Sequence, residues 1–301
     1  MVKNTTKIDR KIAYLFKIRL DSTSKAKVLR YISENSRRFG NKDKRQEKYL
    51  IVTPNPEIVL KCLEDNRLKS VINGATISIP DGIGLIQAFK FLSLPKINNH
   101  IIRPFVYFFQ GFYVGISTFC KRQWLEKDLQ VIHGRILFEE IIRLANKKGL
   151  RLAFLGGGQE VAQKSSQNIA KSYKKVKILA LTGPILDEDA HPVDSKQKDI
   201  EAKAIAKINA FGPHILFLGF GAPKQEKWAD KWINRLNVGG IMVVGGVFDY
   251  YASKVKIPPK WISERELEWF WRLLTQKGRL KRVLMAFPVF PLKVFKFKLG
   301  Q

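Results

Sequence analysis

Residues 214–226 read HILFLGFGAPKQE, a short apolar run followed by a glycine-rich loop and a polar segment. The apolar run has the length of a buried strand, and Pro223 suits the first turn of a helix. The segment therefore predicts a strand, a loop and a helix in succession. Such a unit, repeated, builds a parallel sheet.

The same alternation of strand-length apolar runs and amphipathic segments extends through the chain. We predict further strands at residues 49–53, 76–79, 150–155, 176–181 and 240–244. Spacing and propensity predict helices at residues 56–67, 83–91, 138–148, 159–174 and 196–210. The fold class that follows is α/β, with a mostly parallel, Rossmann-like sheet flanked by helices.

The composition is strongly basic. The 301 residues hold 54 Lys and Arg against 26 Asp and Glu, a net charge of +28, and 45% are hydrophobic. This charge favours polyanionic partners such as nucleic acid, anionic lipid or diphosphate groups. The alternative is that the basic side chains form a solvated surface without such a partner. Because no nucleic-acid recognition motif accompanies it, we expect no specific nucleic-acid partner.

Two cysteines, Cys62 and Cys120, provide no disulfide framework. They favour a reducing compartment. Near the N-terminus, the apolar stretch 12–16 is too short for the core of a signal peptide, so we expect this end to be retained. A cytoplasmic location is the expectation that follows. Nothing in the sequence predicts the oligomeric state.

The chain divides into two predicted parts. Residues 1–255 form the core, with an apolar insertion near 97–131, and residues 256–301 form a basic amphipathic C-terminal appendage. Within the insertion, residues 101–120 carry no charge after Arg103, a length at the lower limit for spanning a membrane. We favour a dip into one leaflet; an apolar segment packed on the domain is the alternative.

The tail interleaves cationic and large apolar residues: residues 279–301 read RLKRVLMAFPVFPLKVFKFKLGQ. This pattern is typical of an interfacial element that buries its apolar side in a membrane surface. Lys293, Lys296 and Lys298 would then face anionic lipid. A disordered basic tail is the alternative.

Polar or glycine-rich loops follow the predicted strands, where ligands of parallel sheets gather. Asn55 precedes Pro56 and either binds substrate hydroxyls or caps the next helix. Asp81, in the segment PDGIG, is either a helix cap, a general base or both. The glycines at 156–158 suit a phosphate at a helix N-terminus or a plain tight turn. Residues 245–249, GGVFD, bring a second glycine turn and a carboxylate to the same edge.

A metal site is not predicted. The four histidines show no ligand spacing that would indicate zinc. Asp187, Glu188 and Asp189, with His191 close behind, resemble the paired acids that hold a divalent cation on a nucleotide diphosphate. A solvated acidic loop is the favoured interpretation. We therefore expect neither a metal nor another cofactor.

Six segments occur in the order and approximate spacing seen in the WecG/TagA/CpsF glycosyltransferases. This chain resembles that family from about residue 18 to residue 282, apart from residues 96–133. The segments are TPNPEIV, IPDGIGL, LAFLGGG, GFGAPKQEKW, GGVFDYYASKVKIPPKW and LEWFWRL. The resemblance implies inverting transfer of a hexose or N-acetylhexosamine, the N-acetylmannosamine type included. The implied donor is a UDP-sugar and the acceptor a polyprenyl diphosphate-linked sugar of cell-surface polysaccharide synthesis.

The resemblance also implies roles for individual residues. Asp81 matches the proposed catalytic base. Donor-site positions are matched by Thr53, Asn55, Gln225, Glu226 and Asp249. The acceptor diphosphate would meet Arg272, Arg279 and Arg282, whose spacing places them along one side of a continuous helix. Such an enzyme would work peripherally at the cytoplasmic face of the membrane, on an anionic surface.

Two positions depart from the family pattern. Ile257 replaces the arginine of an RAP-like element, and Ile136 replaces the acid of a Gly-x-Asp-Leu element. These losses motivate an alternative function, a noncatalytic nucleotide-sugar sensor or scaffold. A basic nucleic-acid-binding protein is the less favoured third option.

Overall fold

The computed structural model describes residues 8–40, 47–259, 262, 268–275 and 280–301. The strands are β1 Lys11–Leu15, β2 Ile18–Ser22, β3 Tyr49–Val52, β4 Ile77–Ser78, β5 Arg151–Gly156, β6 Lys177–Leu181, β7 Ile215–Gly219 and β8 Gly240–Val243. The helices that precede β5 in the chain are α1 Lys25–Ser36, α2 Pro56–Glu64, α3 Asn66–Gly74, α4 Ile83–Ser93, α5 Arg103–Cys120, α6 Arg122–Glu126 and α7 Gly134–Lys148. The later ones are α8 Val161–Ser172, α9 Ser195–Phe211, α10 Lys224–Trp232, α11 Val247–Tyr251, α13 Glu268–Thr275, α14 Leu280–Leu284, the π-helical turn η1 Met285–Val289 and α15 Phe290–Leu299.

Within the described residues, six strands form one parallel sheet in the order β4-β3-β8-β7-β5-β6. The predicted α/β fold is thus confirmed, and each predicted strand lies within a residue or two of an observed one. One predicted helix, 56–67, is divided into α2 and α3. The division occurs because the Asp65 side chain accepts from Leu68 N at 2.8 Å and caps a new helix.

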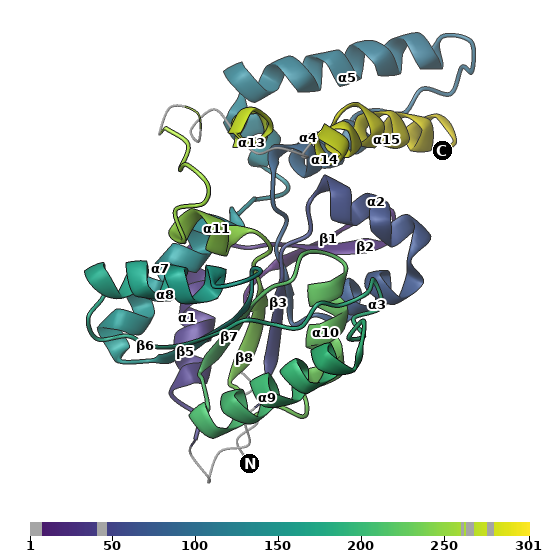
Figure 1. Ribbon diagram of the computed structural model, residues 1–301. Coiled ribbons are helices and arrows are strands. Elements are labelled where there is room, and N and C mark those ends of the chain that lie inside the picture. Colours follow the sequence, from purple (N-terminus) through teal and green to yellow (C-terminus); the bar gives the residue numbers. More distant parts are fainter. Residues whose placement is uncertain (1–7, 41–46, 260–261, 263–267, 276–279) are drawn as a thin grey trace, which may run out of the picture.

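Helices cover both faces of the sheet (Figure 1). Successive side chains of a strand point to opposite faces. In β7, Leu216 and Leu218 therefore join the core under α2, α3, α9 and α10. Ile215 and Phe217 join the opposite core under α1, α7, α8 and α11. Burial on both faces explains why the strands read as continuous apolar runs.

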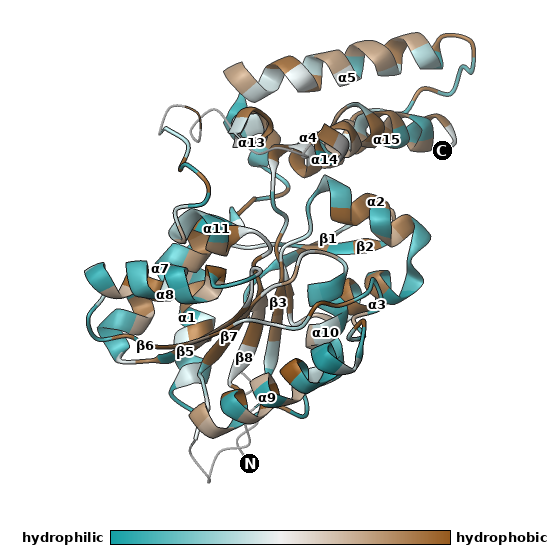
Figure 2. Ribbon diagram, in the orientation of Figure 1, coloured by the Kyte–Doolittle hydropathy of each residue, from teal (hydrophilic) through white to brown (hydrophobic). Residues whose placement is uncertain are grey.

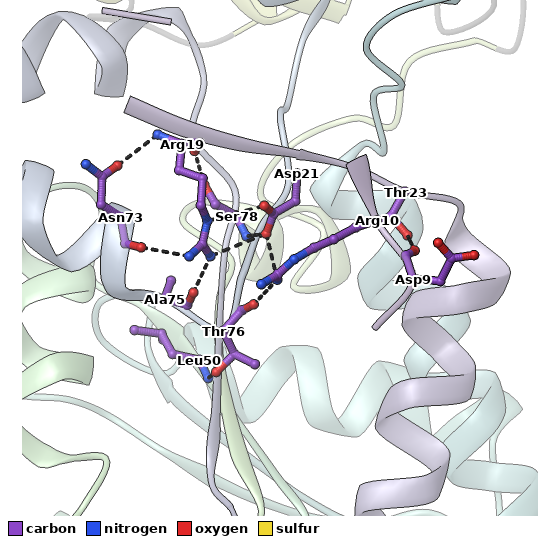
Figure 3. A network of polar contacts seen from close by, with 10 residues as sticks. All are labelled: Asp9, Arg10, Arg19, Asp21, Thr23, Leu50, Asn73, Ala75, Thr76 and Ser78. Atoms are coloured by element: carbon purple, nitrogen blue, oxygen red, sulfur yellow. Dashed lines mark hydrogen bonds and ion pairs between the residues drawn. The ribbon is translucent and has the colours of Figure 1, made fainter. Parts of the chain in front are cut away.

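The N-terminal hairpin β1–β2, which the sequence did not predict, is bound to β4 through a buried carboxylate (Figure 3). Asp21 Oδ2 accepts from Ser78 N at 2.8 Å and pairs with Arg10 Nη1 at 2.9 Å. Arg19 Nε lies 3.2 Å from the other oxygen, and burial lowers the pKa of Arg19. Because the chain continues from Ser78 to Asp81, this network fixes the strand that carries the candidate base.

A second layer of helices lies beyond one end of the sheet, formed by α4, α5, α14 and α15 (Figure 1). The C-terminal helix α15 packs on α4 and α5, with Phe290 and Val294 buried. The tail is therefore an ordered helix rather than a disordered extension. The division of the chain at residue 256 stays a prediction.

Lys298 contradicts the expected role of the tail lysines, because its side chain is fully buried. Its Nζ donates to Phe91 O at 2.5 Å, Leu94 O at 3.2 Å and Gln110 Oε1 at 2.7 Å. The two carbonyls lie at the end of α4, where Phe91 O also accepts from Leu94 N at 3.3 Å. Lys298 cannot meet lipid in this position; Lys293 and Lys296 are exposed, as expected.

Within the insertion, the apolar stretch forms the continuous helix α5, which includes Gly111 and Gly115, and α6 follows it. Among the described residues, no helix combines the length and the apolar character needed to cross a bilayer.

Candidate active site

The loops at the carboxyl ends of the strands meet along one edge of the sheet. From β5 the chain proceeds to β6 on one side, whereas from β7 it proceeds to β8 on the other. Such a reversal opens a crevice between neighbouring loops in doubly wound sheets. The glycines at 156–158, together with Gly219 and Gly221, flank this point. Thr53 and Asp81 follow the strands further along the same edge.

The loops after β3 and β4 are fixed to each other. Asp81 N donates to Pro54 O at 2.8 Å. A side chain at Gly84 would lie 2.9 Å from Pro56 Cγ, so the glycine permits close packing of α4 on the β3 loop. Gly82 has φ +95°, a conformation that other residues adopt only with strain. These contacts fix the backbone of Asp81.

The Asp81 carboxylate is partly exposed, at 32%, and lies beside the start of α7. A Cβ built on Gly134 would be 3.4 Å from Asp81 Oδ2 and 3.6 Å from Thr53 Oγ1, so both side chains surround this helix N-terminus. A carboxylate at this place can accept a proton, which is the role of a general base. The structure thus places two predicted site residues, Thr53 and Asp81, together.

His133 also adjoins Asp81, with Nδ1 3.4 Å from Oδ1. Sequence reasoning missed it, because its place directly before Gly134, where α7 begins, does not by itself indicate a contact with Asp81. A pocket of about 290 Å³ opens beside it, lined also by Lys25, Gln130 and Ile136. Ile136, which departs from the family acid, therefore lines the same pocket as the histidine that adjoins the candidate base.

Asn55 acts as a helix cap, one of the two predicted roles. Its Oδ1 accepts from Ile58 N at 2.9 Å, ahead of Pro56 at the first position of α2. The cap orients the side chain at the carboxyl edge of β3. A contact of Asn55 with the donor stays a prediction.

Gln225 joins the loops after β7 and β8. Its Oε1 accepts from Gly221 N at 3.2 Å and from Gly245 N at 3.0 Å. The side chain is buried, so one amide oxygen holds both glycine turns from beneath. The loops' positions therefore depend on Gln225.

Glu226 is fully buried next to Gln225, whose Nε2 donates to its Oε1 at 2.9 Å. Burial raises the pKa of Glu226 to about 7. Within the described residues, its Oε2 has no hydrogen-bond partner. In this conformation Glu226 lies under the loops and cannot touch a ligand directly. Asp249, by contrast, is half-buried on α11, directly after the β8 loop.

The loop after β5 brings backbone close to the loop after β7. Gly157 N donates to Gly219 O at 2.9 Å, and a Cβ on Gly156 would lie 2.9 Å from the Gly219 carbonyl carbon. A Cβ on Gly158 would have nothing within 4 Å. This turn leads into α8. The outer part of the turn therefore presents backbone N–H groups near a helix N-terminus, an arrangement that suits the binding of an anion.

The three predicted acceptor arginines are described unequally. Arg282 lies on α14 and its Nε is 3.7 Å from Glu57 Oε1, in the first turn of α2. This pair brings the C-terminal segment to the helix that Asn55 caps. Arg272 lies in α13 with a side chain outside the described part, and Arg279 falls outside the described residues.

The acidic loop has internal roles. Asp187 Oδ1 accepts from Asp189 N at 2.9 Å and His191 N at 2.8 Å. Asp189 pairs with Lys227 at 2.8 Å. The described residues contain no group of three or more His, Cys, Asp or Glu that could hold a metal. The absence of a metal in the reaction stays a prediction.

Fold and site together define an α/β protein with a ligand-binding edge that carries a candidate base, glycine turns and an arginine. The model of the "Glycosyl transferase WecG/TagA/CpsF family" matches residues 13–102 and 114–301, so the chain belongs to this glycosyltransferase family. The resemblance read from the sequence is confirmed.

Two relatives share the name N-acetylglucosaminyldiphosphoundecaprenol N-acetyl-beta-D-mannosaminyltransferase. The protein from Bacillus subtilis (strain 168) is 26% identical over 247 residues, which cover 82% of this chain and 79% of the relative. The protein from Staphylococcus aureus (strain NCTC 8325 / PS 47) is 24% identical over 296 residues, 98% of this chain and 94% of the relative.

Proposed function

We propose that this glycosyltransferase moves an N-acetylhexosamine, of the N-acetylmannosamine type, from a UDP-sugar to a polyprenyl diphosphate-linked sugar with inversion at the anomeric carbon. The observation that carries the proposal is the position of Asp81. It is partly exposed, fixed by its backbone to Pro54 O and set at a helix start beside Thr53. The names of the two relatives support the choice of sugar and acceptor.

In the proposed reaction Asp81 takes the proton of the acceptor hydroxyl. The hydroxyl oxygen forms a bond to the anomeric carbon on the face opposite the diphosphate. The bond from that carbon to the diphosphate oxygen breaks, and UDP leaves with the electron pair. Because one displacement occurs from the opposite face, the configuration inverts.

We propose that the donor lies over the glycine turns. Backbone N–H groups at a helix start suit its diphosphate, and Thr53, Asn55 and Asp249 would contact its polar groups. Gln225 and Glu226 would act indirectly, because both are buried: Gln225 bonds to both glycine turns, and Glu226 accepts from Gln225. Their role in donor binding is then to hold the turns in place.

We propose that the acceptor approaches between α2 and the C-terminal segment. Arg282 lies near this path through its pair with Glu57, and guanidinium groups suit phosphate oxygens. Arg272 and Arg279 would extend the cationic set. A lipid-linked acceptor requires a peripheral position at a membrane, and the cysteine usage favours its cytoplasmic face.

A donor screen tests this function. UDP-N-acetylmannosamine, UDP-N-acetylglucosamine and UDP-glucose are each incubated with a short-chain prenyl diphosphate N-acetylglucosamine, and products are read by mass. We expect transfer with UDP-N-acetylmannosamine. Transfer from UDP-glucose alone would overturn the choice of sugar.

One observation favours a second candidate, a noncatalytic nucleotide-sugar sensor. Ile136, at the position of the family acid, lines the pocket beside His133 and offers no polar group there. A sensor would bind UDP-sugar in calorimetry and yield no product with any donor. Product formation that depends on Asp81 would exclude this candidate.

A further inference from the structure

The outer face of α5 exposes a row of large apolar side chains. Phe105 and Phe119 are each 69% exposed at its two ends. Between and beside them, the exposed apolar residues are Phe108, Phe109, Phe112, Tyr113 and Ile116, with Ile101 and Ile102 just ahead of the helix. Their spacing of three and four places most of them on one side of the helix. Figure 2 shows the predominantly hydrophobic colour of α5.

The polar groups near the start of α5 are directed toward the protein. Arg103 donates to Ile97 O at 2.8 Å and to Leu299 O at 3.1 Å. Gln110 donates to Pro95 O at 3.1 Å and accepts from Lys298 Nζ at 2.7 Å. The helix is thus attached through its inner side. Its apolar side is left outward, with no charge from Pro104 to Cys120.

Isolated exposed apolar residues are ordinary, but a contiguous row of this kind marks an interaction surface. The family model leaves residues 103–113 unmatched, so the first part of this row is an addition to the family pattern. The core of the transferase does not account for it. The surface requires a partner of its own.

Charge distinguishes between a bilayer and a second copy of the chain as that partner. The chain carries +28, so two copies repel each other while an anionic surface attracts either one. On α15, which packs beside α5, Lys293 and Lys296 are exposed together with Leu292 and Phe297. Aromatic side chains beside lysines suit the boundary between headgroups and acyl chains.

We propose that the outer face of α5 lies in the headgroup boundary of an anionic bilayer and attaches the enzyme there without crossing the membrane. The inference rests on the proposed function in one respect, since a lipid-linked acceptor requires a nearby bilayer. The attachment by α5 adds to that of the exposed lysines of α15. Because α15 is held to α5 by Lys298, both elements meet the membrane as one platform.

Flotation with phosphatidylcholine vesicles, with and without phosphatidylglycerol, tests the surface. The variant Phe105→Gln/Phe109→Gln/Phe112→Gln should bind the anionic vesicles about tenfold or more weakly, because three apolar side chains lose their burial. The control Ile185→Gln/Val193→Gln, at two exposed apolar residues of the acidic loop, should float like the parent chain. Circular dichroism checks that the variants fold.

A fluorophore reports whether the face enters the bilayer. Phe112→Cys in a Cys120→Ser background provides one exposed thiol, since Cys62 is buried and its pKa is raised to about 12. An environment-sensitive label at 112 should shift to the blue with anionic vesicles and be quenched by lipids carrying a shallow nitroxide. The same label at Val193→Cys, in that background, should respond to neither.

The results separate this inference from the proposed function. Unchanged flotation of the triple variant, or no spectral shift at position 112, overturns the inference even if sugar transfer is found. Loss of a solution dimer in the triple variant, with vesicle binding intact, would assign the face to self-association instead. A blue shift and quenching at 112 support the inference even if no donor yields product.

Discussion

His133 Nδ1 lies 3.4 Å from Asp81 Oδ1, which joins the residue before α7 to the candidate base after β4. The His133 side chain is 20% exposed. Asp81 is also held through its backbone, because its N–H donates to Pro54 O. Two elements distant in the sequence thus orient one carboxylate. The carboxylate remains accessible while its backbone is held, as a general base requires.

Asp81→Asn should lower turnover about a hundredfold to ten-thousandfold, because it removes the base and keeps the shape of the side chain. UDP-sugar affinity should change little. Product formation by mass and calorimetric affinity are measured on the same preparation. Asp189→Asn, in the acidic loop, is the matched control and should retain activity; normal turnover in folded Asp81→Asn would remove this residue from the mechanism.

His133→Ala should lower turnover by less than Asp81→Asn does, because the backbone bond to Pro54 continues to position the carboxylate. The KM for the donor should stay near that of the parent chain, since His133 is proposed to orient Asp81. Steady-state kinetics of both variants, with the kcat and the donor KM determined separately, check this. A loss of kcat equal to that of Asp81→Asn, or a large rise in the donor KM, would contradict a positioning role.

Asp21→Ala should destabilise the fold by about 3–5 kcal/mol, because it leaves the buried cations of the hairpin without their partner. Arg10 and Arg19 both pair with this fully buried carboxylate. Asp9→Ala is the control: Asp9 is 81% exposed and pairs with Lys27 at the surface, so its loss should cost about 1 kcal/mol or less. Urea unfolding measures both; equal losses would refute the importance of the network.

Most of the sheet was predictable because its inner strands β3, β7 and β8 are buried on both faces. A strand such as β7 is therefore a continuous apolar run followed by glycine, a local signal. The caps at Asn55 and Asp65 are local too, although only the first was anticipated. The hairpin β1–β2 was missed because its partner groups, such as Ser78, lie more than fifty residues away.

The candidate site shows the same limit. Thr53 and Asp81 could be placed at one edge because carboxyl ends of parallel strands coincide. His133 could not be assigned to them, since its approach depends on where the inserted helices return the chain to α7. Burial also reversed one inference: Lys298 resembles its exposed neighbours in sequence, yet it bonds to the end of α4.

Glu226→Gln should change how stability depends on pH. In the fold Glu226 keeps its proton up to a pKa of about 7, whereas in the unfolded chain it releases it near 4.5. Its contribution is therefore fully present below about pH 4.5 and is lost as pH rises to about 7. Glutamine stays neutral, so between pH 5 and 8 the variant should gain up to about 3 kcal/mol relative to the parent chain. Urea unfolding at both pH values measures this; a constant difference would contradict a raised pKa.

Lys298→Met should affect stability and Lys296→Met should affect membrane binding, although the two lysines are only two residues apart on α15. Lys298 is buried, and methionine in its place leaves Leu94 O and Gln110 Oε1 without this donor. We expect a loss of about 1–3 kcal/mol and faster proteolysis at the C-terminus, since unpaired buried acceptors are costly. Lys296 is exposed, so its replacement should leave stability unchanged and weaken flotation with anionic vesicles. Unfolding, proteolysis and flotation are measured on both variants. If Lys296→Met destabilised α15 and Lys298→Met did not, the assignment of Lys298 as the link between α15 and α4 would be wrong.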